Sequence, residues 1–157
     1  MVKFRELRRT YGFDEVAISP GSVTVNPELT NTDFSVGPLK ISTPVLGSAM
    51  DAVASPDFAG TMHRQGALSV MNLEGVQSRY DCPQEVIDEI VQADESAVTA
   101  TLQRVYNTPI KESLLGKRVE QIKRSDSICA VSVTPMMTKM LAPIAVEAGA
   151  DLIVVTS

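Results

Sequence analysis

The sequence predicts an α/β fold in which a parallel β-sheet is covered by helices. Dense runs of Leu, Ile and Val, such as residues 151–155, are typical of strands that are buried on both faces. The spacing between strands repeats, since 23 residues separate Val45 from Leu68 and again separate Cys129 from Leu152. Buried strands that alternate regularly with helical segments indicate repeated βα units and therefore a parallel sheet.

Residues 1–43 are expected to form an irregular N-terminal arm with a short hairpin, because turn-forming residues recur along them. The pattern changes at Pro44, and residues 45–49 predict a first strand that leads into a loop. Ser55-Pro56-Asp57 is a strong helix start, with Ser at the N-cap, Pro at the first helical position and an acid beside it. Gly66 is a natural end for this helix.

The second strand is predicted at residues 67–71, and a helix with an apolar stripe opens at Pro83. Residues 94–125 are expected to be a short helical insert, in which one helix carries Leu115, Val119 and Ile122. The third strand is predicted at residues 128–133. A further helix runs from Thr134-Pro135 to Gly149, and the fourth strand follows at residues 151–155.

Four parallel strands fit either a small doubly wound sheet or half of an eight-stranded barrel. Neither GxGxxG nor GxxxxGK[ST] occurs, so the usual nucleotide-binding motifs of a doubly wound sheet are missing. We therefore expect a (β/α)8 TIM barrel, of which the chain holds the arm and about four of the eight strands. Residues 44–157 would be the first half of a barrel of ~250 residues, so the chain is expected to be part of a longer protein.

Composition argues against several classes of protein. The net charge is −5 and the chain has seven aromatic residues and no Trp, which argues against a nucleic-acid surface. No apolar run approaches the ~18 residues of a membrane span. The basic start lacks the apolar stretch of a secretory signal, so a cytoplasmic protein is expected. Cys82, Cys129 and His63 show no metal-ligand spacing, so no metal site is expected, and His63 is assigned a surface or packing role.

In a parallel barrel the functional site lies in the loops that follow the strands. This rule selects four places, which are residues 48–51, 72–75, 132–135 and 156–157. The first place offers a hydroxyl, a polarisable side chain and a carboxylate in Ser48, Met50 and Asp51. Composition alone favours a structural role for them, in which Ser48 and Asp51 satisfy loop backbone and Met50 packs.

Three segments carry a resemblance to a known family. Residues 43–51, TPVLGSAMD, resemble the strand and loop "TP…S-x-M-D" of the IMP dehydrogenase and GMP reductase family, and residues 11–16 and 19–21 are similar to its N-terminal arm. Residues 64–80 resemble the "GAL-x-V-x-NLEG-x-Q-x-RY" stretch of the IMP dehydrogenase-related branch that lacks CBS domains. Only about 50 residues separate the second and third strands, too few for two CBS motifs.

The resemblance implies a TIM-barrel oxidoreductase of guanine nucleotide biosynthesis that converts IMP, NAD and water to XMP and NADH. In the family a Cys attacks C2 of the purine, hydride leaves to NAD and the thioimidate is hydrolysed; a monovalent cation is also used, at a site outside this segment. The family's homo-oligomers are tetramers or octamers. Purine nucleotide would be bound by Ser48, Met50, Asp51 and Asn72, and NAD by Thr156 and Ser157.

The chain departs from the family pattern at two of these places. Thr156 stands where typical members have Asp, and Asn72-Leu73 replaces the usual histidines.

No catalytic residue is expected in this chain, because the resemblance places the nucleophilic Cys after residue 157. Ser127-Ile128-Cys129 is similar to the family's "GSIC" loop, but Cys129 lies in an apolar strand with no basic neighbour and is expected in the core. Cys82 stands at a helix start and matches no family nucleophile. The isolated chain is therefore expected to be inactive.

Three function hypotheses remain open. The first is the IMP dehydrogenase reaction, the second is a GMP reductase that uses NADPH, and the third is a truncated, non-catalytic purine-nucleotide-binding paralogue. The basic group formed by Lys117, Arg118, Lys123 and Arg124 is expected to be a solvated face; an oligomer contact or an effector-phosphate site is the alternative.

Overall fold

The computed structural model describes residues 9–156 and divides the chain into two units, with the boundary between residues 31 and 32. The described part of the first unit, residues 9–31, is exposed and irregular, as predicted. It contains one 3-10 turn, η1 (Pro27–Leu29), which begins where the Asn26 side chain accepts a hydrogen bond from the Glu28 N–H at 3.1 Å.

The second unit opens with the expected hairpin. Strands β1 (Phe34–Val36) and β2 (Leu39–Ile41) pair antiparallel, and Gly37 turns the chain between them with φ +56°. Ile41 is buried against side chains of the main sheet.

The main sheet has four parallel strands in the order β3-β4-β5-β6, which is also their order in the sequence. The strands are β3 (Leu46–Gly47), β4 (Leu68–Asn72), β5 (Ala130–Val133) and β6 (Leu152–Val155). All four were predicted, and their sequential order is that of consecutive barrel strands. The sheet stays open, which agrees with the prediction of part of a barrel.

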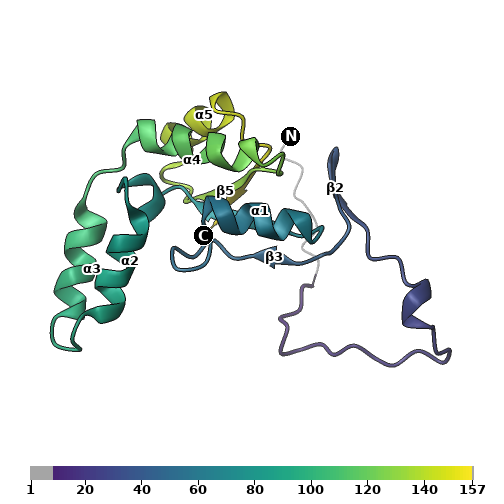
Figure 1. Cartoon of the computed structure of the whole chain (residues 1–157). Coiled ribbons are helices and arrows are strands. Elements are labelled where there is room, and N and C mark those ends of the chain that lie inside the picture. Colours follow the sequence, from purple (N-terminus) through teal and green to yellow (C-terminus); the bar gives the residue numbers. More distant parts are fainter. Residues whose placement is uncertain (1–8, 157) are drawn as a thin grey trace, which may run out of the picture. The chain divides into compact units, whose positions relative to one another are not determined.

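Five helices and a second 3-10 turn connect the strands in the described part of this unit (Figure 1). They are α1 (Pro56–Arg64), η2 (Val76–Ser78), α2 (Pro83–Gln92), α3 (Val98–Asn107), α4 (Glu112–Arg124) and α5 (Thr138–Glu147). The start of α1 is as predicted: the Ser55 hydroxyl accepts a hydrogen bond from the Phe58 N–H at 3.2 Å, and Pro56 is the first helical residue.

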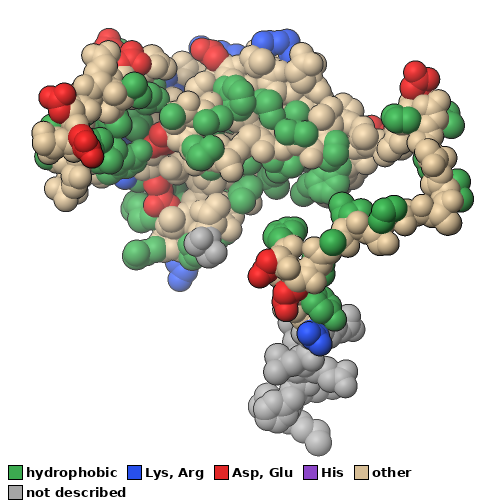
Figure 2. Space-filling model, turned by 90° about the horizontal axis from the view of Figure 1, so that it is seen from below, with side chains coloured by type: hydrophobic (Ala, Val, Ile, Leu, Met, Phe, Trp, Pro, Cys, Tyr) green, Lys and Arg blue, Asp and Glu red, His purple; other side chains and the backbone are tan. Residues whose placement is uncertain are grey.

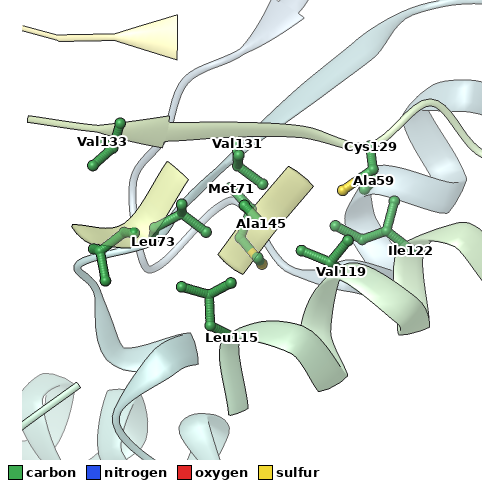
Figure 3. Close-up of a cluster of buried hydrophobic side chains, with 11 residues drawn as sticks. Ala59, Met71, Leu73, Leu115, Val119, Ile122, Cys129, Val131, Val133 and Ala145 are labelled. Atoms are coloured by element: carbon green, nitrogen blue, oxygen red, sulfur yellow. The ribbon is translucent and has the colours of Figure 1, made fainter. Parts of the chain in front are cut away.

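Helices α1, α4 and α5 cover one face of the sheet with an apolar core. Figure 3 shows this core, in which side chains of the three helices meet those of β4 and β5. Its buried members are Ala59, Met71, Leu73, Leu115, Val119, Ile122, Cys129, Val131, Val133, Leu141 and Ala145. A second cluster lies on the other face of the sheet, where Leu68, Val70 and Ala130 surround Ile41. The strands are therefore apolar on both faces, as parallel strands require.

Helices α2 and α3 form a separate pair beside this layered structure. Helix α2 has no buried residue, α3 has only Val105, and an Arg104–Glu89 ion pair joins the two helices. Helix α3 was not predicted from the sequence. The expected helical insert at about residues 94–125 therefore divides in two: α3 pairs with α2, whereas α4 packs against the sheet.

The α2–α3 pair is also acidic. Figure 2 shows acidic side chains gathered at the left-hand end of the molecule, where these helices lie. The exposed acids of the pair are Glu85, Asp88, Glu89, Asp94 and Glu95.

The expectation of a solvated basic face on residues 117–124 is wrong for Arg118. This side chain is only 6% exposed, and its guanidinium donates to the carbonyl oxygens of Gln77, Tyr80 and Asp81 at 2.9–3.1 Å. A buried guanidinium needs such partners, because leaving it unpaired is costly. The periodicity of α4 could not show that the loop after β4 supplies these carbonyls.

In the part of the chain that the structure describes, no helix combines the length and apolar character that crossing a membrane requires.

Substitutions of two valines test which helix supports the sheet. Val119→Ala in α4 removes a fully buried side chain, and we expect it to lower the free energy of unfolding by about 2 kcal/mol. Val91→Ala in α2 removes a side chain that is 77% exposed, and its effect should stay below about 0.5 kcal/mol. Denaturant unfolding of both variants checks this, and equal effects would contradict the assignment of α4 to the core. Any gain in helix propensity is common to both substitutions.

Candidate functional site

The carboxyl ends of the four parallel strands surround a hollow of about 360 Å³. Each strand contributes the residues that end it or follow it, and most of their side chains are polar. The lining residues are Ser48, Ala49, Met50, Asn72, Glu74, Ser132, Thr134 and Thr156. The volume lies in the range of sites for small molecules, about 300–1,000 Å³.

The register of the strands brings polar residues together at this edge. Asn72 at the end of β4 stands opposite Ser132 of β5, and Ser132 stands opposite Val154 of β6. Neighbours in a parallel register share one face of the sheet, so Asn72 and Ser132 both point to the side that carries the hollow. Thr156 follows β6 directly, and its N–H donates to the Val133 carbonyl at 3.1 Å.

Glu74 ties the loop after β4 to the loop after β5. Its carboxylate accepts a hydrogen bond from the Thr134 N–H at 2.6 Å. The Glu74 N–H in turn donates to the Asn72 side-chain oxygen at 2.9 Å, which orients the amide at the strand end. Arg79 donates to the Glu74 carbonyl at 3.0 Å. These bonds fix three of the residues that line the hollow.

Asp51 has partners outside the hollow. One carboxylate oxygen, Oδ2, accepts hydrogen bonds from the Val76 N–H at 3.0 Å and from the Tyr106 hydroxyl at 2.7 Å. The other oxygen, Oδ1, is buried and has no hydrogen-bond partner among the described residues. The carboxylate lies against Gly75, where a Cβ atom would stand 1.8 Å from Oδ1. Asp51 therefore connects the loop after β3 to the loop after β4 and to α3.

This environment keeps the Tyr106 hydroxyl protonated. Partial burial, the hydrogen bond to Asp51 and the Asp51 charge together raise the pKa of Tyr106 to about 12, and the Arg79 charge opposes this only in part. The phenol therefore stays protonated, as a donor to the carboxylate, to a higher pH than an ordinary tyrosine.

The structure brings together four of the residues predicted for the site. Ser48, Met50, Asn72 and Thr156 all line the hollow, whereas the Asp51 carboxylate turns to Val76 and Tyr106. The predicted Ser157 lies outside the described residues.

Glu74, Ser132 and Thr134 also line the hollow, although they were not chosen as site residues. The rule that sites follow the strands pointed to their loops. The part played by Tyr106 had no signal in the sequence.

A larger hollow of about 460 Å³ lies at the opposite end of the strands, next to the β1–β2 hairpin. Lys40, Ser42, His63 and Ile128 are among its lining residues. In parallel barrels the amino ends of the strands serve stability and the carboxyl ends carry the site. The smaller hollow is therefore the candidate functional site.

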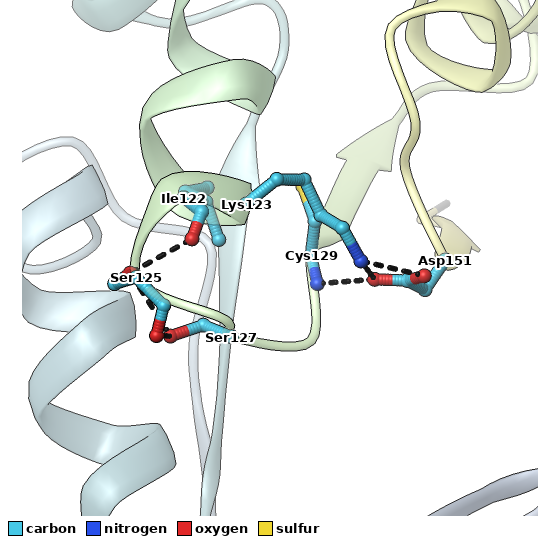
Figure 4. Close-up of polar contacts among 6 residues, drawn as sticks. All are labelled: Ile122, Lys123, Ser125, Ser127, Cys129 and Asp151. Carbon is cyan, nitrogen blue, oxygen red and sulfur yellow. Dashed lines mark hydrogen bonds and ion pairs between the residues drawn. The ribbon is translucent and has the colours of Figure 1, made fainter.

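Cys129 is a core residue, as predicted. Its side chain is fully buried, and burial together with the charge of Asp151 raises the pKa of the thiol to about 12, which Lys123 lowers only in part. Figure 4 shows how Asp151 is held: its carboxylate accepts the Cys129 N–H at 2.7 Å and pairs with the Lys123 ammonium at 2.7 Å. The thiolate needed for nucleophilic attack is therefore disfavoured at Cys129.

The described residues contain no group of three or more His, Cys, Asp or Glu side chains that could hold a metal ion.

Comparisons with known proteins agree on one family. The family described as "IMP dehydrogenase / GMP reductase domain" matches residues 10–157. An uncharacterized oxidoreductase of Mycolicibacterium smegmatis is 33% identical over 156 residues, which are 96% of this chain and 42% of that protein. An inosine-5'-monophosphate dehydrogenase of Methanocaldococcus jannaschii is 31% identical over 70 residues, 45% of this chain and 14% of that protein.

A solved structure agrees with this family. The IMP dehydrogenase/GMP reductase-like protein of Corynebacterium glutamicum is 34% identical and superposes with a TM-score of 0.86 over 98% of this chain and 42% of that one. The chain thus spans less than half of the length of these relatives.

Two glycines test the close contact at Asp51. Gly75→Ala places a methyl group on the Asp51 carboxylate, and we expect it to lower the free energy of unfolding by at least about 2 kcal/mol. Gly116→Ala, in the middle of α4 with open space around it, should instead raise it by about 0.5–1 kcal/mol through helix propensity. Thermal and denaturant unfolding measure both values, and a neutral Gly75→Ala would show that the Asp51–Gly75 packing is unimportant.

The two cysteines should differ in reactivity. In the folded protein at pH 8, iodoacetamide should modify the exposed Cys82 and leave the buried Cys129 untouched. Unfolding in urea should expose both thiols to modification. Peptide mass spectrometry measures the labelling, and rapid modification of Cys129 in the folded protein would contradict its place in the core.

Proposed function

Because the chain belongs to the IMP dehydrogenase / GMP reductase family, we propose that the protein containing it is a purine-nucleotide oxidoreductase that converts IMP, NAD and water to XMP and NADH. The observation that carries this proposal is the hollow at the carboxyl ends of the strands, which polar side chains from four loops line. That edge is where parallel-barrel enzymes bind their substrates. The curated mycobacterial relatives carry the general name oxidoreductase, which agrees with this class of reaction.

The lining residues suit the parts of a nucleotide. Hydroxyl and amide groups at Ser48 and Asn72 offer hydrogen bonds to the polar edges of the substrate, and Met50 offers a polarisable, apolar contact for the purine ring. We assign Thr156, which follows β6, to the NAD side of the site. NAD, when bound, accepts the hydride that leaves C2 of the purine, and water supplies the oxygen of XMP.

The covalent nucleophile of the reaction is assigned to a Cys outside these residues. Cys129 is buried with a raised pKa, and Cys82 is exposed at the start of α2 and does not line the hollow. We therefore assign nucleotide binding to this part of the protein and expect no turnover from residues 1–157 alone.

Two other functions fit the same hollow. A GMP reductase would deaminate GMP with NADPH, and GMP reductase stands in the names of both the family and the Corynebacterium protein. A non-catalytic paralogue would bind the purine nucleotide without turnover. The three cases differ in which nucleotide is converted and in which cofactor is oxidised or reduced, so one set of assays separates them.

The full gene product, supplied with IMP and NAD, should raise absorbance at 340 nm as NADH forms. With GMP and NADPH the absorbance should stay constant. A change in absorbance only in the assay with GMP and NADPH would favour the reductase. Binding of IMP without a change in absorbance in either assay would favour the non-catalytic paralogue. The isolated 157-residue chain, assayed in parallel, should form no XMP.

A pair of serine variants connects the assay to the hollow. Ser48→Ala removes a hydroxyl that lines the hollow, and its loss should weaken IMP binding by about fivefold, the effect of one neutral hydrogen bond of about 1 kcal/mol. Ser113→Ala makes the same change on the exposed start of α4 and should leave the affinity unchanged. Isothermal titration calorimetry with IMP measures both, and equal affinities would remove Ser48 from the site.

A further inference from the structure

Helix α3 reaches the loop after β3 through the side chain of Tyr106. The Tyr106 hydroxyl donates to Asp51 Oδ2 at 2.7 Å, across 55 residues of sequence. Helix α3 belongs to the α2–α3 pair, in which Val105 is the only buried residue. A helix outside the layered core therefore contacts the loop that forms one wall of the hollow.

Asp51 lies in a tight turn together with the residues that line the hollow. The Met50 N–H donates to the Ser48 carbonyl at 2.8 Å, and the Met50 carbonyl accepts the N–H groups of Val53 and Ala54 at 2.9 and 2.8 Å. Ser48 and Met50 line the hollow, and Asp51 is the next residue of the same turn. Whatever fixes the Asp51 carboxylate also fixes the direction in which this turn presents its neighbours.

The carboxylate is held from outside its own loop. The Val76 N–H and the Tyr106 hydroxyl both donate to Oδ2, and Gly75 lies against Oδ1, which lacks a hydrogen-bond partner among the described residues. Without the Tyr106 hydroxyl, the Val76 N–H alone would hold a partly buried charge. Such a charge tends to turn toward water, and the turn that carries it would move as well.

We propose that Tyr106 is a positioning residue, which holds the turn at residues 48–51 in the geometry that binds the nucleotide and so couples the α2–α3 pair to the site. The inference rests on the proposed function for the identity of the ligand. The hold on the turn itself rests on the contacts of Asp51 alone.

Two tyrosine variants of the full gene product test this role. Tyr106→Phe removes the bond to Asp51 and leaves the ring in place. Tyr80→Phe is the matched control, since the Tyr80 hydroxyl bonds the Val105 carbonyl at 3.1 Å and the Thr108 hydroxyl at 2.7 Å, at the same end of α3, and does not touch Asp51. Both variants lose one phenol hydroxyl from the same region.

Two measurements are made on each variant. Calorimetry with IMP should show about tenfold weaker binding for Tyr106→Phe, as expected for one charge-assisted hydrogen bond, and unchanged binding for Tyr80→Phe. Hydrogen–deuterium exchange should be faster at the amides of residues 50–54 in Tyr106→Phe only. Both variants should remain folded by circular dichroism.

The outcomes separate the inference from the proposed function. If the wild-type protein binds no IMP, the proposed function fails, and the exchange rates alone decide whether Tyr106 holds the turn. If the wild type binds IMP and Tyr106→Phe binds it equally well, the positioning role is overturned. Equal weakening in both variants would also overturn it, because the effect would then be a general loosening of α3.

Discussion

Asp51 can take its place only because residue 75 has no side chain. Its Oδ1 lies 1.8 Å from where a Cβ atom of residue 75 would stand, and Oδ2 accepts hydrogen bonds from the Val76 N–H and the Tyr106 hydroxyl. Three segments far apart in the sequence therefore meet at one charged group. Glu74 extends the connection to the loop after β5 through the Thr134 N–H. Glu74 and Gly75 thus set the relative positions of the loops after β3, β4 and β5, which are three of the four loops around the hollow.

This arrangement gives a physical reading of the stretch at residues 72–80. The Glu74 N–H orients the Asn72 amide, Gly75 leaves room for Asp51, and the side chains of Arg79 and Tyr80 both bond Thr108 at the end of α3. The family resemblance rests partly on these residues, and most of their contacts are with other segments of the chain. Residues 72–80 therefore chiefly connect neighbouring loops to one another. Two of them, Asn72 and Glu74, also line the hollow.

The fold could be predicted from the sequence where a pattern reports a local cause. The dense apolar runs marked the four strands, and Ser55-Pro56 marked the start of α1, because strand burial and helix capping depend on nearby residues. Helix α3 was missed because no side chain caps its start at Ala97 and only Val105 is buried. Arg118 was misread for a related reason: its partners are carbonyl groups about 40 residues earlier, which no periodicity in α4 reports. The positions of Ser48, Asn72 and Thr156 at one hollow followed from topology, whereas Tyr106 depends on a tertiary contact without a pattern.

The α2–α3 pair is inserted between β4 and α4. The way it is attached explains why this βα unit keeps its regular packing. Its two flanks are joined, since the Lys111 N–H donates to the Ser78 carbonyl at 2.9 Å and the Lys111 ammonium pairs with Asp81 at 3.2 Å. Arg118 then fixes the outgoing flank to α4 by bonding the carbonyls of Tyr80 and Asp81. The chain thus leaves and re-enters the layered structure at nearly one point, so α4 packs on the sheet as it would if a short loop joined it to β4. Because the two ends of the α2–α3 segment are held together, the segment disturbs the core little. Helix α3 still contacts the loop after β3 through Tyr106.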